Sequence, residues 1–410
     1  MKGFFQVVTP EDVFRLIEDF PVTSTEEIPF HEAVGRILAQ PVFATESIPP
    51  YDRSTMDGYA VRARDTFGAS ESLPNFLTVK GKVRMGEFPV EGLLPGEALQ
   101  ITTGGVLPQD SDAVVMQEYT EQIDETGLEV AKSVAPGENV IHAGEDFNKG
   151  DVLLLQGTKL RPQDIGMMAA IGVTRVDVHR RPLIAVISTG DEIVRVEDDP
   201  APGKIRDINA HALSAGIMEN GGIPLYAGIA PDRFDEIRAK TEEAMDKADM
   251  LLLSGGSSVG SRDFTLRVFA SFPGSSILVQ GIAVSPGKPT ILARIGNKAL
   301  WGLPGHPASS LIVFWLFVRR MIRHVSGFRS RSIEPPQIIT ARLSRNVASA
   351  QGREDYVRVR LSRTEDGYFA APVFGKSGLI STLVKADGVI RIDLYTEGLD
   401  AGTLVDVYLF

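Results

Sequence analysis

The run Leu251-Leu252-Leu253 and the Gly- and Ser-rich segment after it, Ser254 to Gly260, constrain the fold most. Consecutive leucines are typical of a parallel strand that is covered on both faces. Glycine accepts positive φ and allows a close backbone approach, so the segment could direct N–H groups at an anion. Its spacing matches neither the P-loop nor the dinucleotide-binding glycine pattern. An oxyanion site and a ligand-free turn into a helix both remain open.

Alternating apolar runs and helical patterns surround this segment. Predicted strands cover 183–187, 224–229, 277–284, 290–294 and 298–301, and predicted helices cover 209–220, 232–244, 263–272 and 308–324. Asn209 and Asp232 are the predicted N-caps of the first two helices. This order predicts a three-layer α/β domain with a mostly parallel sheet, over residues 181–330. Ligands bind beyond the carboxyl ends of such strands. We therefore expect the loops at Ser188, Ser254, Pro286 and Pro304 to share one rim.

The remaining chain is divided by other patterns. Thr9 and Pro10 start a predicted helix, and further predicted helices cover 31–39 and 161–172. The last of these is expected to return and pack on the N-terminal helices. Glycine-punctuated strands from about 76 to 145 indicate an inserted β-rich domain. Before them, Asp57-Gly58 is a dipeptide that most commonly forms a turn. Pro335-Pro336 indicates a linker. Period-two alternation at 356–361, with a hairpin turn at Asp366-Gly367, predicts a C-terminal antiparallel barrel or sandwich.

The predicted fold class is thus multidomain, α/β plus β. The predicted ranges are 1–47 with 146–180 for a discontinuous linking domain, 48–145 for the inserted domain, 181–330 for the α/β domain and 331–410 for the C-terminal domain.

Composition excludes several functions. A net charge of −11 argues against nucleic-acid binding, and the longest apolar run, 311–318, is too short to cross a membrane. The start of the chain has no signal-peptide pattern, so we expect a cytoplasmic protein. The absence of cysteine excludes a thiol nucleophile and thiolate metal ligands. With only six scattered histidines, any metal is expected to be Mg²⁺ held by carboxylates.

Acidic and basic residues follow the predicted strands. In Thr189-Gly190-Asp191-Glu192, one carboxylate could bind a heterocycle and the other Mg²⁺; alternatively Asp caps a helix and Glu is solvated. Asp263 is equally a helix cap or a metal ligand. Lys288, between two prolines, is a candidate oxyanion ligand. Arg353 and Lys376, on glycine-flanked loops, are weaker candidates. No nucleophile-elbow pattern occurs, which disfavours covalent hydrolysis.

Taken together, these motifs resemble those of the molybdopterin molybdenumtransferase family, which includes the E domain of gephyrin-type proteins. The matching stretches are Met56-Asp57-Gly58-Tyr59-Ala60-Val61, Thr103-Gly104, Gly144-Glu145-Asp146, Ser188-Thr189-Gly190-Asp191-Glu192, Ser254-Gly255-Gly256 with Ser258-Val259-Gly260, Asp263, Pro286-Gly287-Lys288-Pro289 and Gly302-Leu303-Pro304-Gly305. They occur in the family's order over most of the chain.

The resemblance implies an elongated linking domain, an inserted β domain, a molybdopterin-binding α/β domain and a C-terminal β-barrel. It implies a homodimer with the active cleft between subunits. The implied reaction is Mg²⁺-dependent insertion of molybdate into adenylylated molybdopterin, releasing AMP and the molybdenum cofactor. Implied partners also include a molybdopterin adenylyltransferase and molybdoenzymes.

The same resemblance assigns roles to single residues. Asp57 and Thr103 would reach the partner's α/β domain, Glu192 and Asp263 would serve the substrate pocket and metal, and Lys288, Arg353 and Ser377 would face the oxyanion. Asp146, Asp207 and Asp232 would lie near the pocket as further catalytic residues. The implied substrate-binding residues are Ser188, Thr189, Gly190, Asp191, Ser254, Gly255, Gly256, Ser258, Pro304 and Gly305.

Two positions depart from the family's pattern. Ser285 stands where the family commonly has Lys, and His306 where it commonly has Asn. A missing cation should weaken metalate binding by about 1–3 kcal/mol, so tungstate is a second candidate substrate. Two competing hypotheses are a nucleotide or pyrophosphate hydrolase that shares the α/β domain, and a non-catalytic scaffold.

Overall fold

The computed structural model describes residues 7–255, 261–329 and 337–410, without the side chains of residues 261–263. Its residues form two compact units. The first comprises Met1–Gln40, Gln156–Pro162 and Arg175–Phe410, and the second comprises Pro41–Leu155 and Gln163–Thr174. The four domain ranges expected from the sequence stay a prediction.

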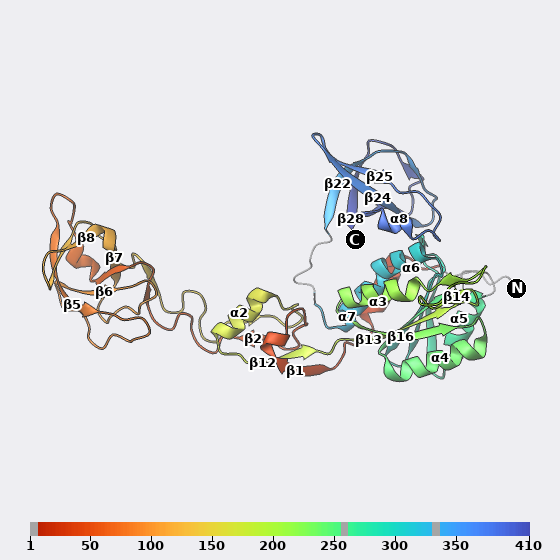
Figure 1. Cartoon of the computed structure of the whole chain (residues 1–410), viewed down its shortest axis with the longest axis horizontal. Coiled ribbons are helices and arrows are strands. Elements are labelled where there is room, and N and C mark those ends of the chain that lie inside the picture. The colour runs from red at the N-terminus through yellow and green to blue at the C-terminus, as the bar shows by residue number, and fades with distance from the viewer. Residues whose placement is uncertain (1–6, 256–260, 330–336) are drawn as a thin grey trace. The chain divides into compact units, whose positions relative to one another are not determined.

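A six-stranded sheet forms the centre of the first unit (Figure 1). Its order is β16 (Ile223–Ala230), β13 (Leu183–Thr189), β17 (Met250–Gly255), β21 (Lys298–Leu303), β20 (Ile291–Ile295) and β18 (Ser275–Gln280). The first four strands are parallel, and the last two run antiparallel to their neighbours. The predicted mostly parallel α/β sheet is confirmed.

Helices cover both faces of this sheet, which explains its continuous apolar runs. They are α3 (Asn209–Glu219), α4 (Phe234–Lys247), α5 (Ser261–Ala270), α6 (Pro307–Val313) and α7 (Arg319–Val325). In β17, Met250 and Leu252 pack with the α3, α6 and α7 side, whereas Leu251 and Leu253 pack with the α4 and α5 side. Because neither face meets water, no position along the strand requires a polar residue.

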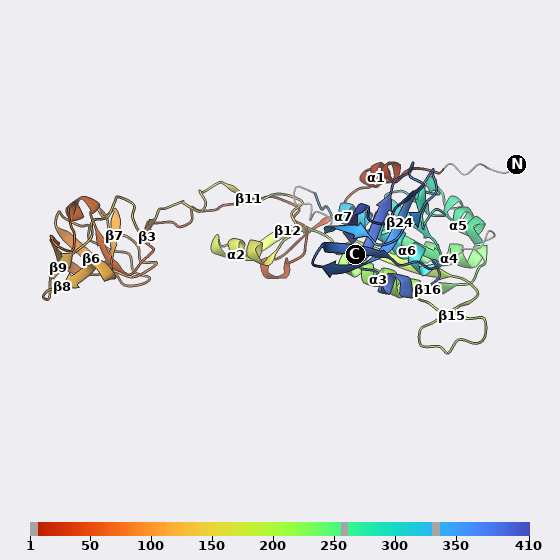
Figure 2. The ribbon, with the colours of Figure 1, turned by 90° about the horizontal axis from the view of Figure 1, so that it is seen from above.

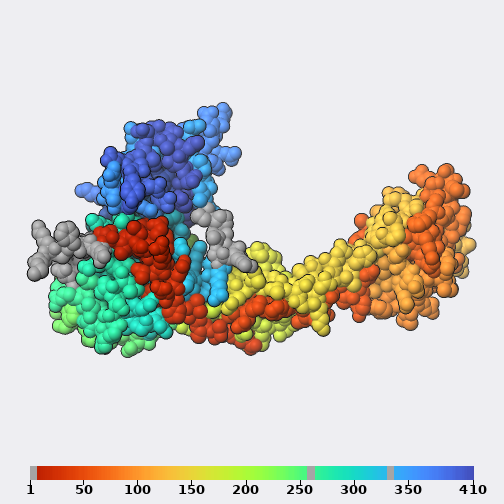
Figure 3. Space-filling view, turned by 180° about the vertical axis from the view of Figure 1, so that it is seen from behind, coloured from red at the N-terminus to blue at the C-terminus, as the bar shows by residue number. Residues whose placement is uncertain are grey.

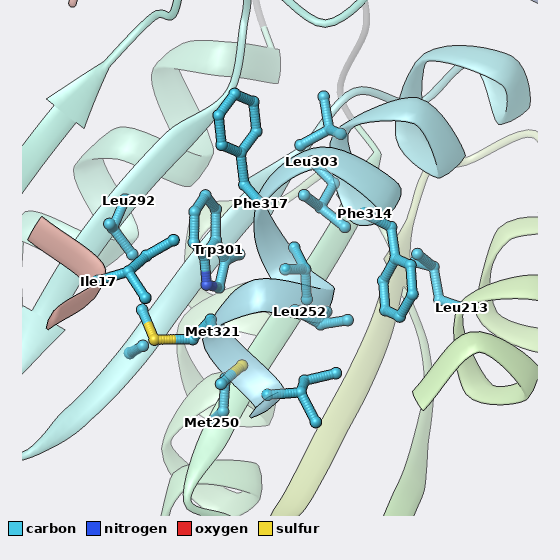
Figure 4. Close-up of a cluster of buried hydrophobic side chains, with 14 of the residues drawn as sticks. Ile17, Leu213, Met250, Leu252, Leu292, Trp301, Leu303, Phe314, Phe317 and Met321 are labelled. Carbon is cyan, nitrogen blue, oxygen red and sulfur yellow. The ribbon is translucent and has the colours of Figure 1, made fainter. Parts of the chain in front are cut away.

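The largest side chain of the core is Trp301, which is fully buried. Figure 4 shows Trp301 among Ile17, Phe317 and Met321, side chains from three different elements. Phe317 lies in a π-helical turn, Phe314–Val318, that joins α6 to α7. The predicted apolar helix over 308–324 is therefore present, with this irregularity in its middle.

Helix α1 (Pro10–Glu18) begins as predicted. Thr9 and Asp12 form a capping box, and Pro10 occupies the first turn. Its apolar face, with Val13 and Ile17, is fully buried in the core of the α/β domain. Figure 3 shows this N-terminal segment in red, against the green α/β domain and below the blue C-terminal barrel.

Two helix predictions need correction. Residues 31–39 form only the 3₁₀ turn η1 (Phe30–Glu32), because Gly35 takes a φ of +76° and Ile37 then pairs in extended form with Lys159. Helix α2 (Pro162–Ala170) exists, but it belongs to the second unit, where Thr45 Oγ1 donates to the Ile171 carbonyl. Helix α1 instead packs on the α/β core.

The second unit contains the expected β-rich sheet. The order is β7 (Ala113–Met116), β4 (Gly58–Val61), β6 (Glu97–Ile101), β5 (Asn75–Lys82), β9 (Gly127–Val130) and β8 (Thr120–Gln122). Asp57-Gly58 is not a hairpin turn. Gly58 begins a central strand, and a Cβ there would lie 1.9 Å from the Val115 carbonyl oxygen. Crowding between strands explains this glycine.

The C-terminal residues of the first unit close into a five-stranded barrel. The strands are β24 (Glu354–Thr364), β25 (Gly367–Pro372), β22 (Ile338–Leu343), β28 (Leu404–Leu409) and β26 (Gly388–Ile392), which pairs back with β24. The predicted hairpin turn at Asp366-Gly367 joins β24 to β25. The predicted linker prolines Pro335-Pro336 lie outside the described residues.

The predicted strand over 277–284 is wrong at its C-terminal end. After β18 the chain turns at Gly281, whose φ is +108°, and forms the separate short strand β19 (Val284–Ser285). Strand β19 does not join the α/β sheet but runs parallel to β24 of the barrel. Within the described residues, every helix falls short of the length and apolar character that a membrane crossing requires.

Candidate functional site

Three parallel strands end side by side on one edge of the α/β sheet. Ser188 of β13 pairs with Ser254 of β17, and Ser254 pairs with Leu303 of β21. The segments after these residues therefore emerge at one rim, as expected for the loops at Ser188, Ser254 and Pro304. The loop at Pro286 was expected there too, but it follows β19, whose partner is the barrel.

The backbone is packed tightly at this rim. A Cβ on Gly255 would lie 2.1 Å from Thr189 Oγ1 and 2.3 Å from the Thr189 carbonyl oxygen. A Cβ on Gly190 would lie 2.6 Å from Glu192 Oε2. Both glycines also have positive φ, at +153° and +150°. These positions accept only glycine without rearrangement, because atoms of Thr189 and Glu192 occupy the space that a side chain would need. Gly256 and Ser258 lie outside the described residues.

Asn209 joins two of the strand ends. Its Nδ2 donates to Ser254 Oγ and to the Gly305 carbonyl, each at 2.8 Å, and its Oδ1 is buried without a partner in the described structure. The sequence predicted Asn209 as the cap of α3. That prediction is wrong, because the Ala210 N–H is accepted by Asp207 Oδ1 at 3.1 Å.

Asp207 is buried and fully engaged. Besides the Ala210 N–H, it accepts hydrogen bonds from Ser188 Oγ at 2.8 Å and from Tyr226 Oη at 3.3 Å. Burial and the Asp207 charge raise the pKa of Tyr226 to about 12. Asp207 thus holds β13, β16 and α3 in place, so it acts on the rim through its neighbours.

Three acidic residues, Asp191, Glu192 and Asp232, directly follow strands β13 and β16 at the rim. The Asp232 N–H donates to Asp191 Oδ1 at 3.2 Å. Burial, then the charges of Glu192 and Asp191, raise the pKa of Asp232, whose Oδ1 is buried and accepts no hydrogen bond from a described residue. Its predicted role as a helix cap is wrong: α4 is preceded by Arg233 and has no side-chain cap.

The segment that follows Asp191 and Glu192 projects from the α/β domain. Figure 2 shows the loop around β15 (Ile205–Arg206), which pairs with β14 (Ile193–Val194). Lys204 Nζ donates to the Asp191 carbonyl and closes the base of this loop. No group of three or more potential metal ligands occurs among the residues described, which exclude the Asp263 side chain. The metal role of Glu192 and Asp263 stays a prediction.

The candidate cations differ in their surroundings. Lys288 is exposed, and its ammonium group has no partner in the described part of the chain, while the adjacent Gly287 presses on α6, where a Cβ would lie 2.5 Å from Val313 Cγ2. Arg353 pairs with the buried Asp355, with Nε 3.1 Å from Oδ1. Lys288 is thus available to an anion, whereas Arg353 is partly neutralised. Lys376 is also exposed.

His306 and Ser377 connect the barrel to the rim. His306 Nδ1 lies 2.9 Å from Ser377 Oγ, and the Ala308 N–H donates to the Ser377 carbonyl at 3.1 Å. His306, one of the two positions at which the chain departs from the family pattern, therefore binds the barrel loop that carries Ser377. Pro304 and Gly305, immediately before it, are the rim residues that this contact positions.

The remaining predicted site residues belong to the second unit. Asp57 Oδ1 accepts hydrogen bonds from the Thr103 N–H at 2.7 Å and from Thr103 Oγ1 at 3.1 Å, and both residues are exposed. Asp146 is exposed on a loop whose Gly144 has a φ of +74°. The structure thus pairs Asp57 with Thr103.

Comparisons with known proteins match most of the chain. Residues 8–172 match the MoeA N-terminal region (domain I and II), residues 185–324 a probable molybdopterin binding domain, and residues 340–410 the MoeA C-terminal region (domain IV). The molybdopterin molybdenumtransferase of Bacillus subtilis is 34% identical, over 94% of this chain and 90% of the relative.

The chain belongs to the MoeA family. The molybdopterin molybdenumtransferase of Haemophilus influenzae is 32% identical, over 97% of this MoeA chain and 96% of the relative. The solved structure of the molybdopterin biosynthesis MoeA protein from Pyrococcus horikosii is 37% identical, with a TM-score of 0.84 over 98% of this chain and 99% of that one. The family and the multidomain fold expected from the motifs are confirmed.

Proposed function

We propose that this MoeA protein is a molybdopterin molybdenumtransferase, which inserts molybdate into adenylylated molybdopterin and releases AMP. The observation that carries the proposal is the rim of three adjacent strand ends, with the acidic residues Asp191, Glu192 and Asp232 directly after strands β13 and β16. Relatives over 90% or more of their length carry that enzyme's name.

The proposed chemistry divides between substrate and protein. The dithiolene sulfurs of the substrate supply the metal-binding atoms, so the protein needs no cysteine, and it has none. The protein must hold a metalate and a pyrophosphate side by side. In a chain with a net charge of −11, the ammonium group of Lys288, which is exposed, can provide part of that local positive potential. Ser377, docked against His306, would complete the oxyanion side.

The carboxylates fit a role for Mg²⁺. Mg²⁺ is usually bound through one or two carboxylates together with substrate phosphates and water. Asp232 offers a buried oxygen that has no hydrogen-bond partner among the described residues, beside Glu192 and Asp191. We propose that Asp232 and Glu192 hold the ion, with Asp263 as a further ligand. Bound there, Mg²⁺ would neutralise charge on the pyrophosphate.

We further propose a cytoplasmic homodimer with its active cleft between subunits. The exposed Asp57–Thr103 pair supports this proposal, because its hydrogen bonds fix the orientation of two polar groups on the surface of the second unit. Asp57, Thr103 and Asp146 would complete the site of the partner chain. Contact with a molybdopterin adenylyltransferase and with molybdoenzymes is part of the same proposal.

The decisive test is AMP release from adenylylated molybdopterin when molybdate is added. We expect Asp232→Asn to slow release by about tenfold or more, since it removes a carboxylate that we propose as a ligand of the Mg²⁺ on the pyrophosphate. Asp235→Asn is the matched control, because Asp235 is exposed in the first turn of α4 and the substitution changes the net charge equally.

Each competing function predicts a different result. AMP release without any metalate would indicate a hydrolase, and bound substrate without AMP release would contradict the proposal. If Asp57→Ala retained full function, a scaffold would be favoured. Competition between molybdate and tungstate, with Ser285→Lys alongside, decides the metalate; an unchanged preference in that variant would show that Ser285 does not contribute.

A further inference from the structure

A basic cavity lies near the amino-terminal ends of the parallel strands, whereas the rim lies at their carboxyl ends. It has a volume of about 210 Å³ and is lined by residues that include Arg36, Lys159, His179, Arg181, Glu219 and Arg323. Arg181 precedes β13 by two residues, whereas the rim follows its last residue. Seven strand residues separate the two ends by about 20 Å, so this cavity is distinct from the proposed active site.

The lining carries an excess of positive charge. Three arginines and one lysine face a single carboxylate, Glu219, which is itself exposed. His179 is 7% exposed and its Nδ1 lies 3.1 Å from the Thr23 carbonyl oxygen. These cations create a local positive potential in a chain whose net charge is −11.

Most of these cations are not used by the protein itself. Arg36 pairs with Glu26 and donates to the His179 carbonyl. Lys159, Arg181 and Arg323, by contrast, have no side-chain hydrogen bond or ion pair with any residue in the described ranges.

Helix capping does not explain the free cations. The cavity adjoins the C-terminal ends of α3 and α7, where basic side chains often bind the last carbonyls. Those carbonyls already have main-chain donors: the Gly221 N–H donates to Met218 at 3.1 Å, and the Phe328 N–H donates to Arg323 at 3.1 Å. The basic groups therefore remain available to a molecule from outside.

We propose that this cavity binds a small phosphate-bearing anion. Guanidinium groups match the oxygens of a phosphate in pairs, and Lys159 adds a point charge. Met218, Ile37 and Phe328 line the same cavity and would contact an apolar part of the ligand. The site is separate from the rim that would bind the pterin substrate.

The test is calorimetric titration of the full chain with inorganic phosphate, pyrophosphate and AMP, in phosphate-free buffer at low salt. We expect the double substitution Arg181→Gln with Arg323→Gln to weaken binding by at least about tenfold, as expected for lost charge-assisted hydrogen bonds. Lys288→Gln, in the loop after β19, should retain this binding. Arg345→Gln controls for general charge, because Arg345 is an exposed barrel residue with no ion pair to any residue that the structure describes.

The outcomes separate this site from the proposed active site. Which of the three anions binds best identifies the ligand: pyrophosphate above phosphate indicates a diphosphate, and AMP above both indicates that the apolar lining is used. The proposal is overturned if none binds the wild-type chain, or if only Lys288→Gln abolishes binding. It is also overturned if the double variant binds normally, or if it changes the sedimentation coefficient instead, since the cavity would then be a subunit interface. A thermal melt of each variant verifies folding.

Discussion

Asn209 should contribute to both the stability and the activity of the α/β domain. In Asn209→Ala, the buried Ser254 hydroxyl and the Gly305 carbonyl lose the donor that holds each at 2.8 Å. Two unpaired acceptors cost about 2–4 kcal/mol, and removal of the unpaired Oδ1 returns about 1 kcal/mol, so the net loss in unfolding free energy is about 1–3 kcal/mol. At about 2–4 °C per kcal/mol, the melting transition should fall by about 2–12 °C.

The assay combines scanning calorimetry with AMP release measured well below the transition. Activity should fall even where the domain is fully folded, because β17 and β21 lose their common tie at the rim. Asn346→Ala is the matched control: it removes one amide hydrogen bond, from the Ala401 N–H to Asn346 Oδ1, on an exposed barrel loop. Equal stability and activity in the Asn209 and Asn346 variants would refute the role given to Asn209.

Three further predictions follow from contacts at the rim. Gly255→Ala should lower the melting temperature and activity together, since its methyl group would overlap Thr189; an unchanged calorimetric transition would contradict the close contact. The Tyr226 phenol should ionise at a pH of about 12, and at a pH of about 10–11 in Asp207→Asn, which an absorbance titration in the near ultraviolet checks. The raised pKa of Asp232 means that the folded state binds its proton more tightly than the unfolded state. Protonation of this carboxyl group therefore stabilises the folded state at low pH, and that stabilisation is lost as pH rises through the folded pKa. Denaturant unfolding should therefore find Asp232→Asn increasingly stable relative to wild type with rising pH; a pH-independent difference would show that the pKa is not raised.

The strands at 183–187 and 251–253 were predictable because both sheet faces are covered, so that every residue of each run is apolar. The barrel hairpin and the capping box of α1 were predictable for a similar reason, since each is fixed by residues a few positions apart. The MoeA motifs identified the family because their order is preserved over most of the chain.

What sequence reasoning missed depends on distant partners. Asn209 has the composition of a helix cap, but its amide reaches two strand ends 45 and 96 residues away, and Asp207 takes the cap instead. Asp232 likewise precedes a helix, yet its carboxyl lies with Asp191 and Glu192. The glycine at 58 resembles a turn residue because the carbonyl that excludes a side chain comes from another strand. Local pattern contains no information on such neighbours.

Strand β19 determines where this protein can be divided. Its residues precede α6 in the chain, but they extend the barrel sheet, and the Glu354 N–H donates to the Ala283 carbonyl. The barrel is therefore not an interchangeable tail. Recombination between relatives that joined one protein's barrel to another's α/β domain at the 330s would combine a β24 with a foreign β19, and would succeed only where residues 283–285 are compatible with the incoming strand. Strands β19 and β24 must therefore be inherited together, although α6 and α7 lie between them in the chain.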